Sequence, residues 1–192
     1  MSRRWRVAAV AVAITLVAAG VLMQRAVAGA AVTELVTNGG FEQPVVAAGH
    51  YVNVSSIPGW AEAAPRNCGI EIQNHVAGSP FQGNQFTELD SNCSTEIQQD
   101  LTTVPGRVYR LSFAFSARPG RGAADNILQV WWNGRLIDTR QADGSGLADT
   151  AWQVFHYRVR ATGAKTRLAF ADAGVSNGYG TYLDAVSVTC ER

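Results

Sequence analysis

Hydrophobic and polar residues alternate along much of the chain, and this period of two predicts β-strands. The clearest case is residues 107–117, RVYRLSFAFSA, whose polar positions Arg110, Ser112 and Ser116 share one face. The opposite face collects the large apolar side chains: Tyr109, Leu111, Phe113 and Phe115, followed by Ala117. Because successive strand residues point to opposite sides, the pattern predicts a sheet with one dry face and one wet face.

Similar short stretches recur over most of the chain after residue 32. We predict strands within 70–75, 86–91, 126–134 and 152–161, and a tight turn at Asn133-Gly134. No stretch keeps a helical period. Turn signals spaced about 8–12 residues apart indicate an antiparallel sandwich or barrel.

The first 28 residues have the composition of a secretory signal peptide. Arginines precede an apolar run, and the run ends in the small-residue pattern Ala26-Val27-Ala28. We therefore expect cleavage after Ala28 or Ala30, a single domain over residues 29–192, and a secreted protein. The alternative is a membrane anchor, because the run is close to the length of about 18 residues needed to span a bilayer.

The charge balance argues against nucleic acid as a partner. The whole chain has 16 basic and 15 acidic residues, and four of the arginines lie in the leader, which has no acid. The remainder is therefore slightly acidic, whereas nucleic-acid-binding domains carry a basic excess.

The three cysteines, Cys68, Cys93 and Cys190, permit one disulfide in an exported protein. If 70–75 and 85–90 pair as antiparallel strands, the start of the first lies beside the end of the second. Cys68 then comes near Cys93. We predict that these two are bonded and that Cys190 keeps a free thiol.

Catalytic signatures are few. The sequence contains no G-x-S-x-G, H-E-x-x-H or P-loop pattern. Glu71, Glu88 and Asp90 are expected on the outward faces of two neighbouring strands, where a carboxylate pair can hydrolyse glycosides. They can equally form ion pairs with arginines across the sheet. We predict that the protein is not an enzyme.

Tryptophans suit a binding function better, because sugars are recognised by flat aromatic rings and a few polar groups. Trp131 and Trp132 are adjacent on one predicted strand, so they must face opposite sides. Trp132 shares a face with Leu128 and Val130 and is expected in the core. Trp131 is then the exposed ring.

Several motifs together resemble a known family. The chain is similar to the secreted galactose-binding-like jelly rolls, which include many carbohydrate-binding modules, and more closely to the family called domain of unknown function 642. The matching stretches are VTNGGFEQP, IPGW (57–60), IEIQNHVAGSPFQGNQFTELDS (70–91), LSFAFSARPG (111–120), VWWNG (130–134) and YLDAVSV (182–188). The resemblance implies an all-β, two-sheet antiparallel sandwich, export, and the binding of glycans or cell-wall polysaccharide without catalysis.

The resemblance also implies a structural calcium. In such modules an acid after the N-x-G-F motif and an acid in the closing L-D-x-V-S motif often share the ion. Here these acids are Glu42 and Asp184, with oxygens from the Asn38–Gly40 turn as further ligands. Many relatives carry a second acid where this chain has Ala185, so the predicted site has one carboxylate fewer.

For the sugar, the resemblance indicates Glu71, Glu88, Asp90 and Arg118, to which the exposed Trp131 is added. Arg118 can bind hydroxyls or a carboxylate such as that of galacturonate, or can pair with Asp90 or Glu88. We expect a secreted, monomeric glycan-binding module. The alternatives are an extracellular adhesion or structural module that binds protein or a surface layer, and a small glycoside hydrolase.

Overall fold

The computed structural model describes residues 33–63 and 67–191, which contain twelve strands. They are β1 (His50–Val54), β2 (Ser56–Ile57), β3 (Trp60–Glu62), β4 (Ile70–Asn74), β5 (Phe86–Glu88), β6 (Glu96–Thr102), β7 (Val108–Ser116), β8 (Ile127–Trp132), β9 (Arg135–Gln141), β10 (Gln153–Arg160), β11 (Lys165–Asp172) and β12 (Tyr182–Cys190). Within these ranges no helix is long and apolar enough to cross a membrane. The predicted signal peptide lies outside the described residues.

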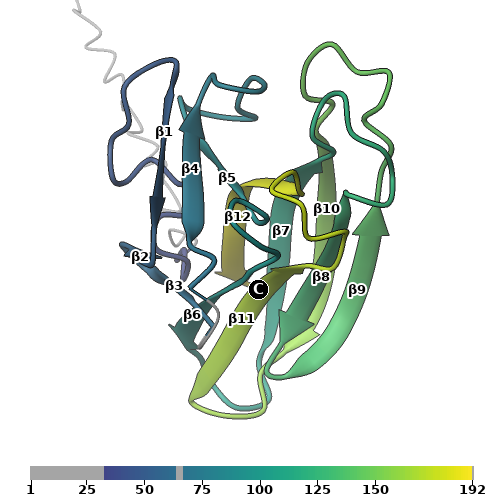
Figure 1. Ribbon diagram of the computed structural model, residues 1–192. Coiled ribbons are helices and arrows are strands. Elements are labelled where there is room, and N and C mark those ends of the chain that lie inside the picture. Colours follow the sequence, from purple (N-terminus) through teal and green to yellow (C-terminus); the bar gives the residue numbers. More distant parts are fainter. Residues whose placement is uncertain (1–32, 64–66, 192) are drawn as a thin grey trace, which may run out of the picture. The chain divides into compact units, whose positions relative to one another are not determined.

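The strands form two antiparallel sheets of six, as Figure 1 shows. The order in sheet A is β1-β4-β5-β12-β7-β10, and in sheet B it is β2-β3-β6-β11-β8-β9. The prediction of an all-β, two-sheet jelly-roll sandwich is therefore confirmed. Each sheet buries one face against the other, which explains the alternation in the sequence.

The core lies between the two sheets. Phe113 of sheet A packs edge-on against Phe170 of sheet B, with 5.1 Å between ring centroids. Trp60 of β3 lies 6.1 Å from the same Phe170 ring. Trp132 is buried in this core, as its alternation with Leu128 and Val130 predicted.

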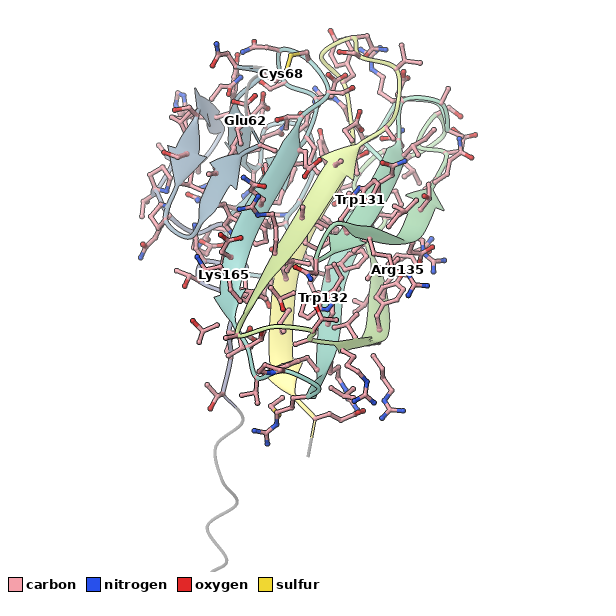
Figure 2. The ribbon with its side chains drawn as sticks, turned by 90° about the horizontal axis from the view of Figure 1, so that it is seen from below. Glu62, Cys68, Trp131, Trp132, Arg135 and Lys165 are labelled. Carbon is pink, nitrogen blue, oxygen red and sulfur yellow. A yellow bond between two sulfur atoms is a disulfide. The ribbon has the colours of Figure 1, made fainter. Side chains whose placement is uncertain are left out.

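The predicted hairpin and disulfide are both present. Strands β4 and β5 pair antiparallel, with Glu71 opposite Glu88. Cys68, just before β4, is bonded to Cys93 in the connection to β6, and the sulfur atoms are visible beside the Cys68 label in Figure 2. Cys190 is a free thiol at the end of β12, within the part of the chain that the structure describes.

The opening segment VTNGGFEQP packs directly on β12. Gly39 accepts a hydrogen bond from Val186 N at 2.8 Å, and a Cβ on this glycine would lie 1.9 Å from the Val186 carbonyl oxygen. No residue with a side chain fits such a contact. Phe41, fully buried, then fixes the segment in the core and leaves Glu42 beside the middle of β12.

Candidate functional site

One row of side chains crosses the outer face of sheet A. The strand register places Asn53 opposite Glu71, Glu71 opposite Glu88, Glu88 opposite Tyr182, and Tyr182 opposite Ser116. These five residues come from five adjacent strands. Directly opposite residues in antiparallel strands share a face, so the five form one continuous polar row.

Loops cover most of this row, although it lies outside the core between the sheets. Glu88 is 1% exposed, and Tyr182 and Ser116 are buried as well. Beside the row, Phe86 packs against Tyr182 and Trp152, with centroid distances of 4.7 and 5.7 Å. The result is a second buried layer, built from acids, amides and aromatic rings.

Hydrogen bonds and an ion pair hold the acids in place. Arg118, just after β7, forms an ion pair with Glu88. The Gln73 amide donates to Glu71 at 2.7 Å and to Glu88 at 2.5 Å. Gly180 N donates to the second Glu88 oxygen at 2.9 Å. A buried carboxyl group with partners on both oxygens has a fixed orientation.

Burial raises the pKa of Glu88 from its ordinary value of 4.5 to about 8, and the nearby Glu71 carboxylate adds to the rise. The positive charge of Arg118 and the Gly180 N–H oppose it. The pKa of Tyr182 is also raised, first by burial and then by Glu88. Burial in the row therefore favours the protonated form of both groups.

A hollow of about 370 Å³ opens above one end of the row. Two exposed aromatic residues border it: Tyr51 of β1 is 57% exposed, and Tyr179 in the connection to β12 is 37% exposed. Its remaining lining residues are Asn53, Glu71, Gln73, Val76, Ser91, Asn92, Arg118 and Gly178. The size lies within the range of about 300–1,000 Å³ typical of small-ligand sites.

Two arginines fix the Tyr179 ring. The Arg121 guanidinium lies 3.3 Å from the ring centroid, and that of Arg118 lies 4.9 Å away. Such cation–π contacts favour a fixed ring position. The wall of the hollow is consequently preorganised.

The structure brings together only part of the predicted ligand set. Glu71 and Arg118 line the hollow, and Glu88 lies beneath it, paired with Arg118. Asp90 is buried and accepts hydrogen bonds from Asn177 N at 2.9 Å and Gly178 N at 3.1 Å. It therefore holds the loop that carries Tyr179.

Trp131 is far from this group in the topology, because β8 belongs to sheet B and the row belongs to sheet A. Figure 2 labels Trp131 and Trp132 in sheet B. Trp131 is half-buried, and its Nε1 is buried with no acceptor among the described residues. The predicted grouping of Trp131 with Glu71 and Arg118 does not occur, because alternation identifies a face but not a sheet.

The predicted calcium ligands lie close together and fit the ion in part. Asp184 is fully buried, Glu42 helps to raise its pKa, and neither carboxylate has a basic partner within 33–63 and 67–191. However, Asp184 accepts hydrogen bonds from Phe81 N and Gln82 N, and Glu42 accepts two more from the same loop. Both carboxylates thus bind the 81–85 loop.

The further ligands expected from the Asn38–Gly40 turn stay a prediction. The Asn38 side chain donates to Gln43 O at 2.7 Å and accepts from Gln43 N at 3.1 Å, so its oxygen is already engaged. No cluster of three or more His, Cys, Asp or Glu side chains suited to a metal occurs in the part that the structure describes. Calcium stays a prediction that rests on two carboxylates and on backbone carbonyls.

Sequence reasoning missed Tyr51 and Asn53 as lining residues. Their signal was the alternation in HYVNV, which places both on the face opposite to Val52 and Val54. Tyr179 lies in the connection to β12. Its position depends on the course of the loop before β12, which no periodicity predicts.

Comparisons of the sequence with known proteins give a distant relative but no family. No family model matches the chain. The multifunctional-autoprocessing repeats-in-toxin of Vibrio vulnificus is 28% identical over 158 residues, which are 82% of this chain and 3% of the toxin. The chain thus spans only a small part of that relative's length.

Similar solved structures include two cleaved adhesin domains of Lys-gingipain. The K1 domain, from Porphyromonas gingivalis W83, has a TM-score of 0.55 and 12% identity over 74% of this chain and 98% of that chain. The K2 domain has a TM-score of 0.52 and 10% identity over 85% and 99%. A family 61 carbohydrate-binding module solved with β-1,4-galactotriose has a TM-score of 0.48 and 17% identity over 83% and 99%. At these identities the likeness concerns the fold, and the resemblance to domain of unknown function 642 stays a prediction.

Proposed function

We propose that this protein is a non-catalytic glycan-binding module and that the hollow above Glu71 is its sugar site. The observation that carries the proposal is the pairing of a rigid polar floor with two exposed tyrosines at the rim. A pyranose ring has an apolar face and a periphery of hydroxyl groups. Tyr51 and Tyr179 suit the first, and Asn53, Glu71 and Arg118 suit the second.

The charges around the hollow favour a neutral sugar. The Arg118 guanidinium is bonded to Glu88 and lies over the Tyr179 and Tyr182 rings, so it is already engaged. Glu71 is the acid on the lining, and its Oε2 accepts from Ser91 at 2.5 Å rather than from a basic group. A uronic acid such as galacturonate would bring a second carboxylate beside Glu71, with Arg118 already engaged.

The arrangement favours binding over hydrolysis. A glycosidase needs two carboxyl groups that reach the scissile bond. Glu88 is buried under Arg118 and does not line the hollow, which leaves Glu71, itself only 7% exposed, as the one acid among the lining residues of that hollow. We therefore expect no release of reducing sugar from polysaccharides.

We further propose export and a structural calcium. The Cys68–Cys93 disulfide suits an oxidising compartment, in agreement with the signal-like leader. Calcium bound by Glu42 and Asp184 would offset the repulsion between two carboxylates that lack a basic partner.

A glycan array tests the binding function. The wild-type protein is expected to bind one class of neutral polysaccharide. Tyr179→Ala is expected to lose that signal, because it removes the ring that Arg118 and Arg121 hold in place. Leu136→Ala, an exposed apolar position on sheet B, is the matched control and should bind as the wild type does. Equal binding by all three proteins would place the site elsewhere.

A further inference from the structure

A second hollow of about 420 Å³ lies next to the first. The two share Val76, which is 43% exposed. Neighbouring residues of the chain also line the two hollows: Arg118 lines the first, and Pro119 lines the second. The other residues of the second hollow are His75, Ala77, Gly78, Ser79, Ala148 and Asp149. The two hollows therefore adjoin at Val76.

The second hollow is also preorganised. Asp149 accepts hydrogen bonds from Ser79 N at 2.8 Å and from Ser79 Oγ at 2.7 Å. The Ser79 carbonyl in turn accepts from Thr150 Oγ1 at 2.6 Å and from Trp152 Nε1 at 2.8 Å. These four bonds tie the 75–79 segment to the 149–152 segment across 70 or more residues of sequence. The space between them is a fixed feature of the surface.

The first and second hollows are joined to the same buried layer. Tyr182, in the polar row, donates its hydroxyl to Ala77 O at 3.2 Å. Trp152, whose Nε1 donates to the Ser79 carbonyl, packs against Phe86 beside that row. Because this layer is closely packed, a movement of the wall of either hollow would also require the buried layer to move.

The chemistry of the second hollow also suits a sugar. His75 is exposed, and its Nδ1 lies 2.8 Å from Asn74 Oδ1, which orients the ring. Val76 offers an apolar surface at the junction, and Ser79 and Asp149 supply polar atoms along the wall. Each hollow exceeds the lower limit of about 300 Å³ for sites of drug-sized ligands, so each can accept a ligand of about the size of a disaccharide.

We propose that the two hollows are consecutive subsites for one linear neutral polysaccharide, so that the protein recognises a run of several sugars and not a single residue. The inference rests on the proposed glycan-binding function and extends it to ligand length. A chain that fills both hollows adds contacts at Val76 and His75 without a second loss of translational freedom, so affinity rises with length.

Isothermal titration with oligosaccharides of two, four and six sugars, prepared from galactan, xylan and mannan, tests the inference. For the series that binds, affinity is expected to rise at least tenfold from two to six sugars. His75→Asn should remove most of that rise and leave the affinity for two sugars unchanged. Asparagine is chosen because His75 has a φ of 55°, a left-handed conformation that asparagine tolerates. Tyr51→Ala should weaken every length, and Leu136→Ala none.

The outcomes distinguish a failure of the second subsite from a failure of the glycan-binding function. Binding that is lost in Tyr51→Ala but has the same affinity at two and six sugars, with no effect of His75→Asn, overturns the second subsite and leaves the binding function standing. Absence of binding by any oligosaccharide or parent polysaccharide overturns the function and the second subsite together.

Discussion

The two outer faces of the sandwich differ in what covers them. On sheet A the row Asn53, Glu71, Glu88, Tyr182 and Ser116 lies largely buried beneath loops. On sheet B the equivalent row is Ala61, Gln98, Ala169, Trp131 and Leu136, one residue from each of five strands. The first row holds acids that need partners, whereas the second holds mostly apolar side chains.

This difference is the reason for placing the proposed binding site on the outer face of sheet A. Burial of an acid is unfavourable unless hydrogen bonds or an opposite charge compensate it. Sheet A meets that requirement with Arg118, Gln73 and the Gly180 N–H. Sheet B keeps its charges at the surface, where Asp100 pairs with Arg167 and Lys165. A fold needs no buried acid row for stability, and this is one reason why we propose that the ligand binds on sheet A.

The largest expected difference between the faces is in stability. Arg118→Met leaves Glu88 buried without its charge partner and is expected to lower the free energy of unfolding by about 3 kcal/mol at pH 10, where the Glu88 carboxyl group is ionised. Arg167→Met removes an exposed pair and should cost less than about 1 kcal/mol. Urea denaturation of both variants measures the two values. Equal losses would mean that the pair on sheet A is no more important than the pair on sheet B.

The second expected difference between the two faces is in glycan affinity. Tyr179→Ala is expected to weaken glycan binding at least tenfold, which is about 1.4 kcal/mol. Trp131→Ala, on the opposite sheet, should leave the affinity within about twofold. Titration calorimetry at matched protein concentrations measures both. The reverse ranking would return the site to Trp131, where the sequence alone had placed part of it.

The two faces should also differ in how their acids make the free energy of unfolding depend on pH. The pKa of Glu88 is raised from 4.5 to about 8, so between these values the folded protein retains a proton that the unfolded chain has released. Its contribution to stability is complete below about pH 4.5 and is lost as the pH rises through 8.

Glu88→Gln removes this dependence and provides the measurement. The groups that face Glu88 are Arg118, Glu71, Gln73, Tyr182 and the Gly180 N–H, and all are retained in the variant. Between pH 5 and pH 8 the wild type should lose at least about 1.4 kcal/mol more than the variant, the equivalent of one pKa unit. Arg167→Met should keep the wild-type profile. Parallel profiles for Glu88→Gln and the wild type would contradict the raised pKa.

The smallest expected effect concerns calcium. Saturating calcium should raise the Tm by about 2–4 °C, because an ion that binds only the folded state adds to its stability. Glu42→Gln should abolish the rise, whereas Asp100→Asn, on the outer face of sheet B, should retain it. Differential scanning calorimetry with calcium and with chelator measures the shift. A wild-type Tm that is the same in both conditions would eliminate the ion.

Alternation in the sequence predicted the strands within 70–75, 86–91, 107–117, 126–134 and 152–161 and the inward position of Trp132, but it did not predict β1, β2, β3 or β6. It did not show to which sheet a strand belongs, so Trp131 was grouped with residues of the other sheet. It also did not reveal the course of the loops. Asp90 was expected to bind ligand, but it holds the backbone at 177–178, and that loop places Tyr179 at the hollow.

The central claim is that a glycan binds on the outer face of sheet A. The most direct measurement is a ¹H–¹⁵N correlation titration of the labelled protein with the polysaccharide fragment that the array selects. The account predicts shifts confined to amides near Asn53, residues 71–79 and residues 178–180. Shifts centred on Gln98, Trp131 and Ala169, with the sheet A amides unmoved, would contradict it.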